Sequence, residues 1–290
     1  MHIPVLLKEV IDALNLKIGE VAIDGTAGSG GHAKEILKKI GDEGKLLLVD
    51  WDRSSAENLK KEFNGRKNVV YVNGNYADLP QIIKENKFPK ADALLLDLGF
   101  SSEQLGGGKG FSFMKDEPLI MTYSDERESL GEFLRHTNPK ELTGIIRKYG
   151  EERYAQKIAG AIMENRRKLK TTKDLADVIA KSVPKNYEHG RIHPATRTFQ
   201  ALRIYLNKEF ENIEKVISSL EEIVRPGGRI AVISFHSLED RIVKQSFNEL
   251  KNKGRLLLIN KKPITPSQEE IEVNPRSRSA KLRAAILKSD

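Results

Sequence analysis

The sequence predicts an α/β fold with a parallel, doubly wound sheet, and three observations support this class. Short apolar runs that suit buried strands alternate with amphipathic runs that suit helices through the first hundred residues. The first strand, Val21–Ile23, ends at Asp24 and passes through a glycine-rich turn into a helix. After a long stretch of helical patterns, the strand pattern resumes at Arg229–Phe235.

Four strands with three helices between them form the predicted amino-terminal part of the sheet. A short helix precedes them at Val5–Leu14, because its apolar residues recur at helical spacing. The predicted strands are Val21–Ile23, Lys45–Val49, Asn68–Val72 and Ala91–Leu96. The predicted helices are His32–Ile40, Arg53–Phe63 and Asp78–Glu85. Sheets of this kind bind ligands at the carboxyl edge of their strands.

A helical insertion follows the fourth strand. Beyond the glycine loop at 106–110, only helical patterns occur as far as about Leu206. Asn138 caps the first helix and Gly150 ends it. The later helices are Glu151–Arg166, Thr172–Ser182 and one that starts at His193 and runs on through Val224. We predict a sheet domain in two parts, 1–108 and 207–290, interrupted by a helical insertion at 109–206 that recognises the substrate.

The carboxyl-terminal part returns to the sheet pattern. Strands are predicted at Arg229–Phe235, Arg255–Ile259 and Lys281–Lys288, with a helix at Glu239–Asn252. Between the last two strands, Lys261–Ser279 is polar and contains prolines, which predicts a loop.

Composition restricts the function classes. The 290 residues carry a net charge of +8, from 49 basic and 41 acidic residues, which favours a polyanionic partner such as nucleic acid. The longest apolar runs are far shorter than a membrane span, and the amino terminus lacks a signal-peptide pattern. The chain has no cysteine, which excludes disulfides, thiolate metal sites and cysteine nucleophiles. We expect a cytoplasmic protein.

The glycine-rich turn suits two nucleotide-type ligands. Gly28–Ala33 satisfies the G-x-G-x-x-G/A pattern of dinucleotide sites, and Asp50 and Asp52 follow at about the right distance. S-adenosylmethionine is the competing ligand. Asp24 would repel a pyrophosphate, but it suits a ligand head that carries an amino group and a sulfonium.

Side chains at successive strand ends complete this candidate site. Asp50, at the end of the second strand, is placed to accept hydrogen bonds from the two hydroxyls of a ribose. Tyr76 can lie against an adenine. Asp97 ends the fourth strand. Each has a structural alternative, a helix cap for the aspartates and packing for the tyrosine, but their regular spacing favours a shared pocket.

Six motifs resemble the RsmH (MraW) family, in the family's order and from His2 nearly to the C-terminus. They are Ile23–Thr26 with Gly30–His32, Asp97–Gln104, Gly110–Phe113, Tyr149–Arg153, His193–Arg203 and Ile233–Arg241. The resemblance implies a class I methyltransferase fold with a helical insertion. It also implies S-adenosylmethionine-dependent methylation of the N4 amine of a cytidine in small-subunit (16S) ribosomal RNA, near the decoding centre.

The resemblance also implies site residues. The positions that match the family's cofactor contacts are Gly30, Gly31, His32, Asp50, Tyr76, Asp97 and Gln104, to which the turn itself adds Asp24 and Gly28. One departure concerns Ile120-Met121-Thr122, where the family usually has Asp-Met-Arg. The loss of an acid and a base there argues against a substrate contact by that segment.

Asp97 is the candidate catalytic residue. A cytosine N4 amine is a poor nucleophile, because its lone pair is delocalised into the ring. A carboxylate or carbonyl that accepts its hydrogen bonds would take up the developing positive charge. Asp97, with the backbone around Leu98 and Gly99, is placed to orient the amine and the donor; a role confined to the cofactor stays open. Methylation at C5 would need a cysteine adduct, which this chain cannot form.

Basic and histidine residues supply the candidate RNA contacts. They are His193, Arg197 and Arg203 in the insertion, and His236, Arg276 and Arg278 near the carboxyl-terminal edge. Neighbouring Arg191, Lys281 and Arg283 and the run Arg166–Lys168 add to these clusters. Arg197 and Arg203 are six positions apart and do not share one helical face, so at least one suits a structural role. His189 and His193 lack an evident third ligand, so we predict no metal site.

The predicted partner is small-subunit ribosomal RNA in an assembled or nearly assembled particle. The oligomeric state stays open, a homodimer included. Two alternatives to the methyltransferase are kept: a non-catalytic RNA-binding assembly factor with a retained cofactor pocket, and a nicotinamide-dependent oxidoreductase.

Overall fold

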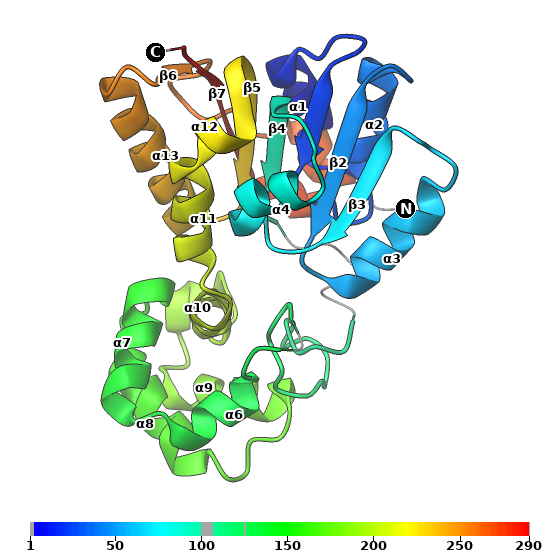
Figure 1. Cartoon of the computed structure of the whole chain (residues 1–290). Coiled ribbons are helices and arrows are strands. Elements are labelled where there is room, and N and C mark those ends of the chain that lie inside the picture. The colour runs from blue at the N-terminus through cyan, green and yellow to red at the C-terminus, as the bar shows by residue number, and fades with distance from the viewer. Residues whose placement is uncertain (1–2, 100–106, 125, 290) are drawn as a thin grey trace. The chain divides into compact units, whose positions relative to one another are not determined.

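The computed structural model describes residues 3–99, 107–124 and 126–289. Its Cα atoms group into two compact units, Met1–Ser101 with Phe210–Asp290, and Ser102–Glu209. The first unit holds the sheet and the second is helical (Figure 1). Residue contacts thus divide the chain at 101/102 and 209/210, whereas the sequence patterns change at 108/109 and 206/207.

The first unit contains a seven-stranded mixed sheet in the order β3-β2-β1-β4-β5-β7-β6. Its strands are β1 (Val21–Asp24), β2 (Lys45–Asp50), β3 (Val69–Asn73), β4 (Ala91–Asp97), β5 (Val224–Ser234), β6 (Leu256–Leu258) and β7 (Lys281–Leu287). The strands β3, β2, β1, β4 and β5 pair in parallel, as predicted. The last strand differs from the prediction, because β7 runs antiparallel to both β5 and β6.

Helices cover both faces of the sheet, which explains why its central strands β1, β2 and β4 are mostly apolar. Successive residues of β1 and β4 enter opposite cores: Ala22 and Leu95 pack on one face, Ile23 and Leu94 on the other. The first face carries α1 (Leu7–Leu14), α2 (Gly31–Ile40) and α3 (Arg53–Glu62). The second carries α4 (Leu79–Glu85), α11 (Glu209–Ser218), α12 (Leu220–Ile223) and α13 (Ser237–Asn252) (Figure 1).

Two regions of this unit differ from the prediction. The strand β5 begins at Val224, five positions before the predicted start at Arg229. Val224 pairs with Ala91 before the register shifts, and the exposed residues 225–227 lie at that shift. The predicted loop at 261–279 contains α14 (Gln268–Val273) and the 3₁₀ helix η3 (Pro275–Ser279). Ser267 caps α14 by accepting a hydrogen bond from the Glu270 amide, a short capping signal that the prolines of this stretch obscured.

The second unit is built from helices. They are α6 (Leu130–His136), α7 (Pro139–Gly150), α8 (Ala155–Asn165), α9 (Thr172–Ser182), η2 (Tyr187–Gly190) and α10 (Thr196–Asn207). Its core includes Leu142, Ile146, Ile158 and Leu202, all fully buried. The last helix ends at Asn207 and does not run on to Val224, because Lys208 takes a left-handed conformation with φ +53°.

No helix in the described stretches combines the length and the apolar character that crossing a lipid bilayer requires.

Candidate cofactor and substrate site

The ends of β1, β2 and β4 are joined by short backbone hydrogen bonds. The Gly25 amide donates to the Leu95 carbonyl and the Ala27 amide donates to the Val49 carbonyl, each at 3.0 Å. The Gly74 amide donates to the Asp50 carbonyl, also at 3.0 Å, and so brings the segment after β3 to the same edge. The turns that leave these strands therefore lie side by side, as their predicted place at one sheet edge requires.

The glycine-rich turn is held against Asp50. The Gly28 amide donates to Asp50 Oδ2 at 2.8 Å, and the Asp52 amide donates to Oδ1 at 2.8 Å. Asp50 is 5% exposed. A carboxylate oxygen has two lone pairs and can accept more than one hydrogen bond.

Two glycines of the turn are required by the backbone and by close packing. Gly30 precedes α2 with φ +80°, and a Cβ there would lie 3.0 Å from both the Leu59 and Phe63 side chains. A Cβ at Gly31 would lie 2.5 Å from Pro4. The turn thus brings bare backbone amides to the start of α2, next to the strand-end acids, an arrangement that suits a polar ligand.

Asp24 is a buried acid at this edge, and its pKa is raised. It is 1% exposed, and burial raises the pKa of its carboxyl to about 7, with further upward contributions from the charges of Asp97 and Asp50. The Thr26 amide partly opposes this rise by donating to Asp24 Oδ1 at 3.1 Å. No ion pair joins Asp24 to a basic side chain within the described part of the chain. A cationic ligand head would offset the cost of charging this buried acid.

Asp97 lies next to Asp24 and is held by three groups. Its amide donates to Thr26 Oγ at 2.6 Å, and its Oδ1 accepts from the Gly99 amide at 3.2 Å. Its Oδ2 lies 3.7 Å from Nδ1 of His32, whose Nε2 donates to the Val5 carbonyl at 3.0 Å. The Asp97 side chain is 18% exposed, so its carboxylate is fixed in place and still accessible.

Tyr76 reaches this edge from the segment after β3. A Cβ at Gly25 would lie 3.3 Å from the Tyr76 Cβ, so the tyrosine packs against the turn that follows Asp24. Its 3₁₀ helix, η1 (Tyr76–Asp78), begins after Asn75, whose side chain accepts from the Ala77 amide at 2.9 Å. Gln104, the remaining predicted cofactor residue, lies outside the described residues. The structure thus brings Asp24, Asp50, Tyr76 and Asp97 together.

The predicted RNA residues of the second unit have different surroundings. His193 is exposed and its ring stacks on Phe113. Arg197 is 31% exposed, with Nη1 3.1 Å from Glu188 Oε1. Arg203 is 14% exposed, and Nε and Nη2 both donate to the Glu209 carboxylate at 2.8 Å. This bidentate pair favours a structural role for Arg203.

The remaining predicted RNA residues lie in the first unit. Arg276 and Arg278 are exposed on η3, whereas neighbouring Arg283 is 8% exposed and binds Asp240 at 2.7 and 3.2 Å. Arg283 therefore forms an internal ion pair and does not belong to the exposed basic cluster that was predicted.

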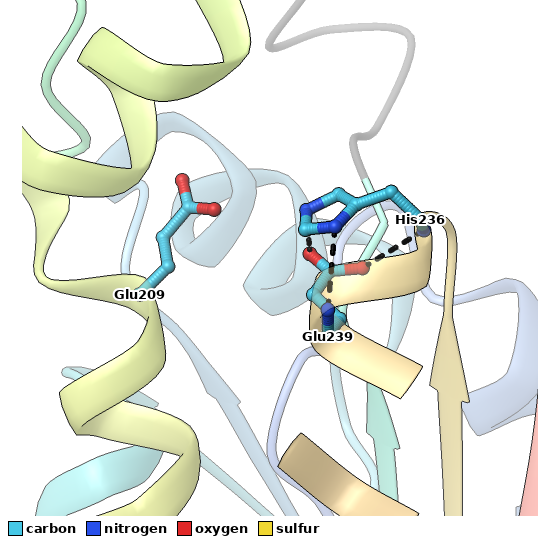
Figure 2. A group of neighbouring side chains, drawn as sticks. All are labelled: Glu209, His236 and Glu239. Atoms are coloured by element: carbon cyan, nitrogen blue, oxygen red, sulfur yellow. Dashed lines mark hydrogen bonds and ion pairs between the residues drawn. The ribbon is translucent and has the colours of Figure 1, made fainter. Parts of the chain in front are cut away.

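His236 caps a helix. Its Nδ1 accepts from the Glu239 amide at 3.3 Å at the start of α13, and Glu239 Oε2 accepts from the His236 amide at 3.3 Å (Figure 2). Glu239 Oε2 also accepts from the Phe235 amide at 2.8 Å. His236 Nε2 also lies 3.0 Å from Glu239 Oε1. These contacts favour a positioning role for His236. Glu209, also drawn in Figure 2, belongs to the other unit and to the Arg203 pair described above.

Some contacts were not foreseen from the sequence. Thr26, in the Asp-Gly-Thr turn, joins β1 to β4 by accepting a hydrogen bond from the Asp97 amide, and its position just after Asp24 is a sequence feature that could have indicated this. Glu188 forms an ion pair with Arg197, which no sequence pattern indicated. The divergent segment Ile120–Thr122 is internal: Met121 and Thr122 are 0% and 1% exposed, and the Asn207 side chain donates to the Met121 carbonyl at 2.9 Å. This segment therefore supports the fold of its unit.

The sheet order, the antiparallel β7 and the glycine turn after β1 define a class I methyltransferase fold. The sequence agrees with this class: the model of the MraW methylase family matches residues 1–288. Two relatives, each named ribosomal RNA small subunit methyltransferase H, are 44% identical to the chain. The one from Syntrophus aciditrophicus covers 98% of this chain and 96% of its own, and the one from Coprothermobacter proteolyticus covers 97% and 94%. The chain belongs to the MraW methylase family. The fold class and the family resemblance predicted from the sequence are both confirmed.

Proposed function

We propose that this chain transfers a methyl group from S-adenosylmethionine to the N4 amine of a cytidine in small-subunit ribosomal RNA. The substrate class follows from its relatives, which carry the name ribosomal RNA small subunit methyltransferase H. The N4 amine follows from the family resemblance of the motifs. The proposed location is the cytoplasm, where such an RNA is available.

The observation that carries the proposal is the buried Asp24 beside Asp50 and Asp97, an acid that has no basic partner among the described residues. These acids suit S-adenosylmethionine better than a dinucleotide, because the former carries an ammonium and a sulfonium cation, whereas the latter carries an anionic pyrophosphate that the acids would repel. Asp50 would accept from the ribose hydroxyls, Asp24 would compensate the positive charge, and Tyr76 would lie against the adenine. When bound, the cofactor would supply an already activated methyl group.

The protein's own contribution to the reaction is positioning and charge stabilisation. The Asp97 carboxylate is held by the Gly99 amide and by its own amide's bond to Thr26, so it is a fixed acceptor for an amine hydrogen. A fixed acceptor takes up the positive charge that develops on the attacking nitrogen without having to reorganise. The absence of cysteine leaves no route through a cysteine adduct at C5, which supports the amine as the methylated atom.

The RNA is proposed to contact exposed basic residues of both units. Arg197, Arg276 and Arg278 have accessible guanidinium groups that suit phosphates, which position an RNA without reading its sequence. Arg203 is omitted, because its donors bind Glu209. The target base must be unstacked for its amine to reach a methyl group.

Neither alternative function has support from the comparisons. A nicotinamide-dependent oxidoreductase and a non-catalytic assembly factor both differ in class from a methylase family that matches nearly the whole chain.

The direct assay supplies labelled S-adenosylmethionine and small ribosomal subunits that lack the methyl group. We expect label to enter the small-subunit RNA, and nucleoside analysis to identify N4-methylcytidine. Transfer to another atom would contradict the assigned position. Cofactor binding without any transfer would favour the assembly factor.

Two single substitutions separate the cofactor site from the RNA contacts. Asp50→Ala should weaken S-adenosylmethionine binding by roughly 10- to 100-fold, because hydrogen bonds to a charged acceptor are lost. Arg197→Ala should leave that affinity unchanged, weaken RNA binding and lower the salt dependence of RNA binding by about one unit of slope. Titration calorimetry measures the first effect and filter binding at several salt concentrations measures the second.

The matched controls for this pair are exposed residues of the same types. The side chains of Asp42 and Arg53 are 88% and 81% exposed, so Asp42→Ala and Arg53→Ala should behave as the unaltered chain. If Asp50→Ala impaired RNA binding and Arg197→Ala impaired cofactor binding, the assignment of the two sites would be reversed.

A further inference from the structure

An aromatic stack stands on the surface of the helical unit. The His193 ring lies on Phe113 with ring centroids 4.7 Å apart and planes inclined by 20°. Phe113 is half-buried and meets the buried Phe199 edge-on at 5.3 Å, which anchors it to the core of the unit. One face of the imidazole is therefore covered by Phe113, while the residue as a whole remains exposed.

The imidazole is fixed in orientation. The Ala195 amide donates to its Nδ1 at 3.1 Å, and Phe113 supports one face of the ring. A flat ring that is held in this way suits stacking against another flat ring.

The surroundings suit an unpaired nucleotide. Arg191, two positions before His193, is exposed, and Arg197 is four positions after it. Met114, next to Phe113 in the chain, is 82% exposed and adds an adaptable apolar side chain. Proteins bind unstacked bases of single-stranded RNA by stacking them on flat side-chain rings, with arginines nearby that contact the phosphates.

We propose that His193, supported by Phe113, is a stacking platform for an unpaired base of the substrate RNA. This inference rests on the proposed RNA substrate and specifies how one part of that RNA is recognised. The contact is stacking on the open face of the imidazole, and the neighbouring arginines bind the phosphates.

Two substitutions of His193 separate stacking from the local turn. His193→Phe keeps an aromatic face and loses the acceptor for the Ala195 amide. His193→Asn keeps a side-chain acceptor and loses the ring. The substrate is the same undermethylated small subunit, and the readout is KM for that particle in methyl transfer at two salt concentrations.

A stacking platform predicts that His193→Asn raises KM by about 5- to 150-fold, the range for loss of one base–aromatic stack. His193→Phe should stay within about threefold of the unaltered chain. The ratio of variant to unaltered KM should be the same at both salt concentrations, because no phosphate contact is lost. Phe113→Leu, which removes the support beneath the imidazole, should also raise KM.

The outcomes are distinguishable. If His193→Asn behaves normally and His193→Phe does not, His193 serves only the turn and the platform is contradicted. A ratio of variant to unaltered KM that decreases as the salt concentration rises would show that His193 contacts a phosphate, and this would also contradict the platform. If the unaltered chain transfers no methyl group to the particle, the proposed function itself fails.

Discussion

Asp97→Asn lowers kcat for methyl transfer by about 100- to 1,000-fold, the loss typical of removing one preorganised electrostatic group. The asparagine oxygen can still accept from the Gly99 amide, so the turn after β4 should keep its shape. What is lost is the negative charge that faces the attacking amine. KM for S-adenosylmethionine should change by less than about tenfold, since most cofactor contacts remain. Steady-state kinetics with undermethylated small subunits measure both constants.

Asp92→Asn is the matched control for this substitution. Asp92 is also buried, at 5% exposure, and lies near the other end of the same strand, where its Oδ2 accepts from the Val21 amide at 2.8 Å. Its replacement should leave kcat unchanged even where the unfolding temperature falls. If Asp97→Asn raised only KM for the cofactor and left kcat intact, Asp97 would be a cofactor contact and not a catalytic residue.

Asp24→Asn should stabilise the free protein and weaken cofactor binding. The folded-state pKa of Asp24 is about 7 against an ordinary 3.8, so the folded chain keeps a proton that the unfolded chain loses between these values. Stability from this group is therefore present below about pH 4 and is lost as pH rises to about 7. Asparagine avoids that loss, so at pH 8 the variant should be more stable by on the order of 4 kcal/mol.

Cofactor affinity should show the opposite pH dependence. The ionised form of Asp24 is the one that binds a cationic head, so affinity should rise about eightfold between pH 6 and 7.5 in the unaltered chain. In Asp24→Asn the affinity should be lower and independent of pH in this range. Denaturant unfolding and titration calorimetry measure the two effects. A variant that is less stable at pH 8 yet binds normally would show that Asp24 is a structural residue.

Much of the sheet unit could be predicted because its signals are local. The strands β1, β2 and β4 are mostly apolar, each ends at an aspartate, and in a parallel sheet those ends must share an edge. The clustering of Asp24, Asp50 and Asp97 then follows from topology alone. Tyr76 could be added because it follows the remaining strand of that edge.

What was missed depends on contacts that are distant or conformational. The predicted long helix ends before Lys208, which takes a left-handed conformation. No glycine or proline at this position indicated the end of the helix. The sequence placed Arg283 in a basic cluster, but in the structure it pairs with Asp240, which is 43 positions away in the chain. The direction of β7 depends on the end of the neighbouring strands at which the chain enters the sheet. The periodicity of Lys281–Leu287 does not specify that end.

The central claim is that the edge formed by β1, β2 and β4 binds S-adenosylmethionine, and thermal unfolding with added ligand tests it most directly. At 100 times its dissociation constant the cofactor should add about 2.7 kcal/mol to the unfolding free energy, and NAD at the same concentration should add nothing. Asp50→Ala, with its affinity lowered 10- to 100-fold, should keep only about 0.4 to 1.4 kcal/mol of this response at that concentration. Stabilisation by NAD with none by S-adenosylmethionine would contradict the account.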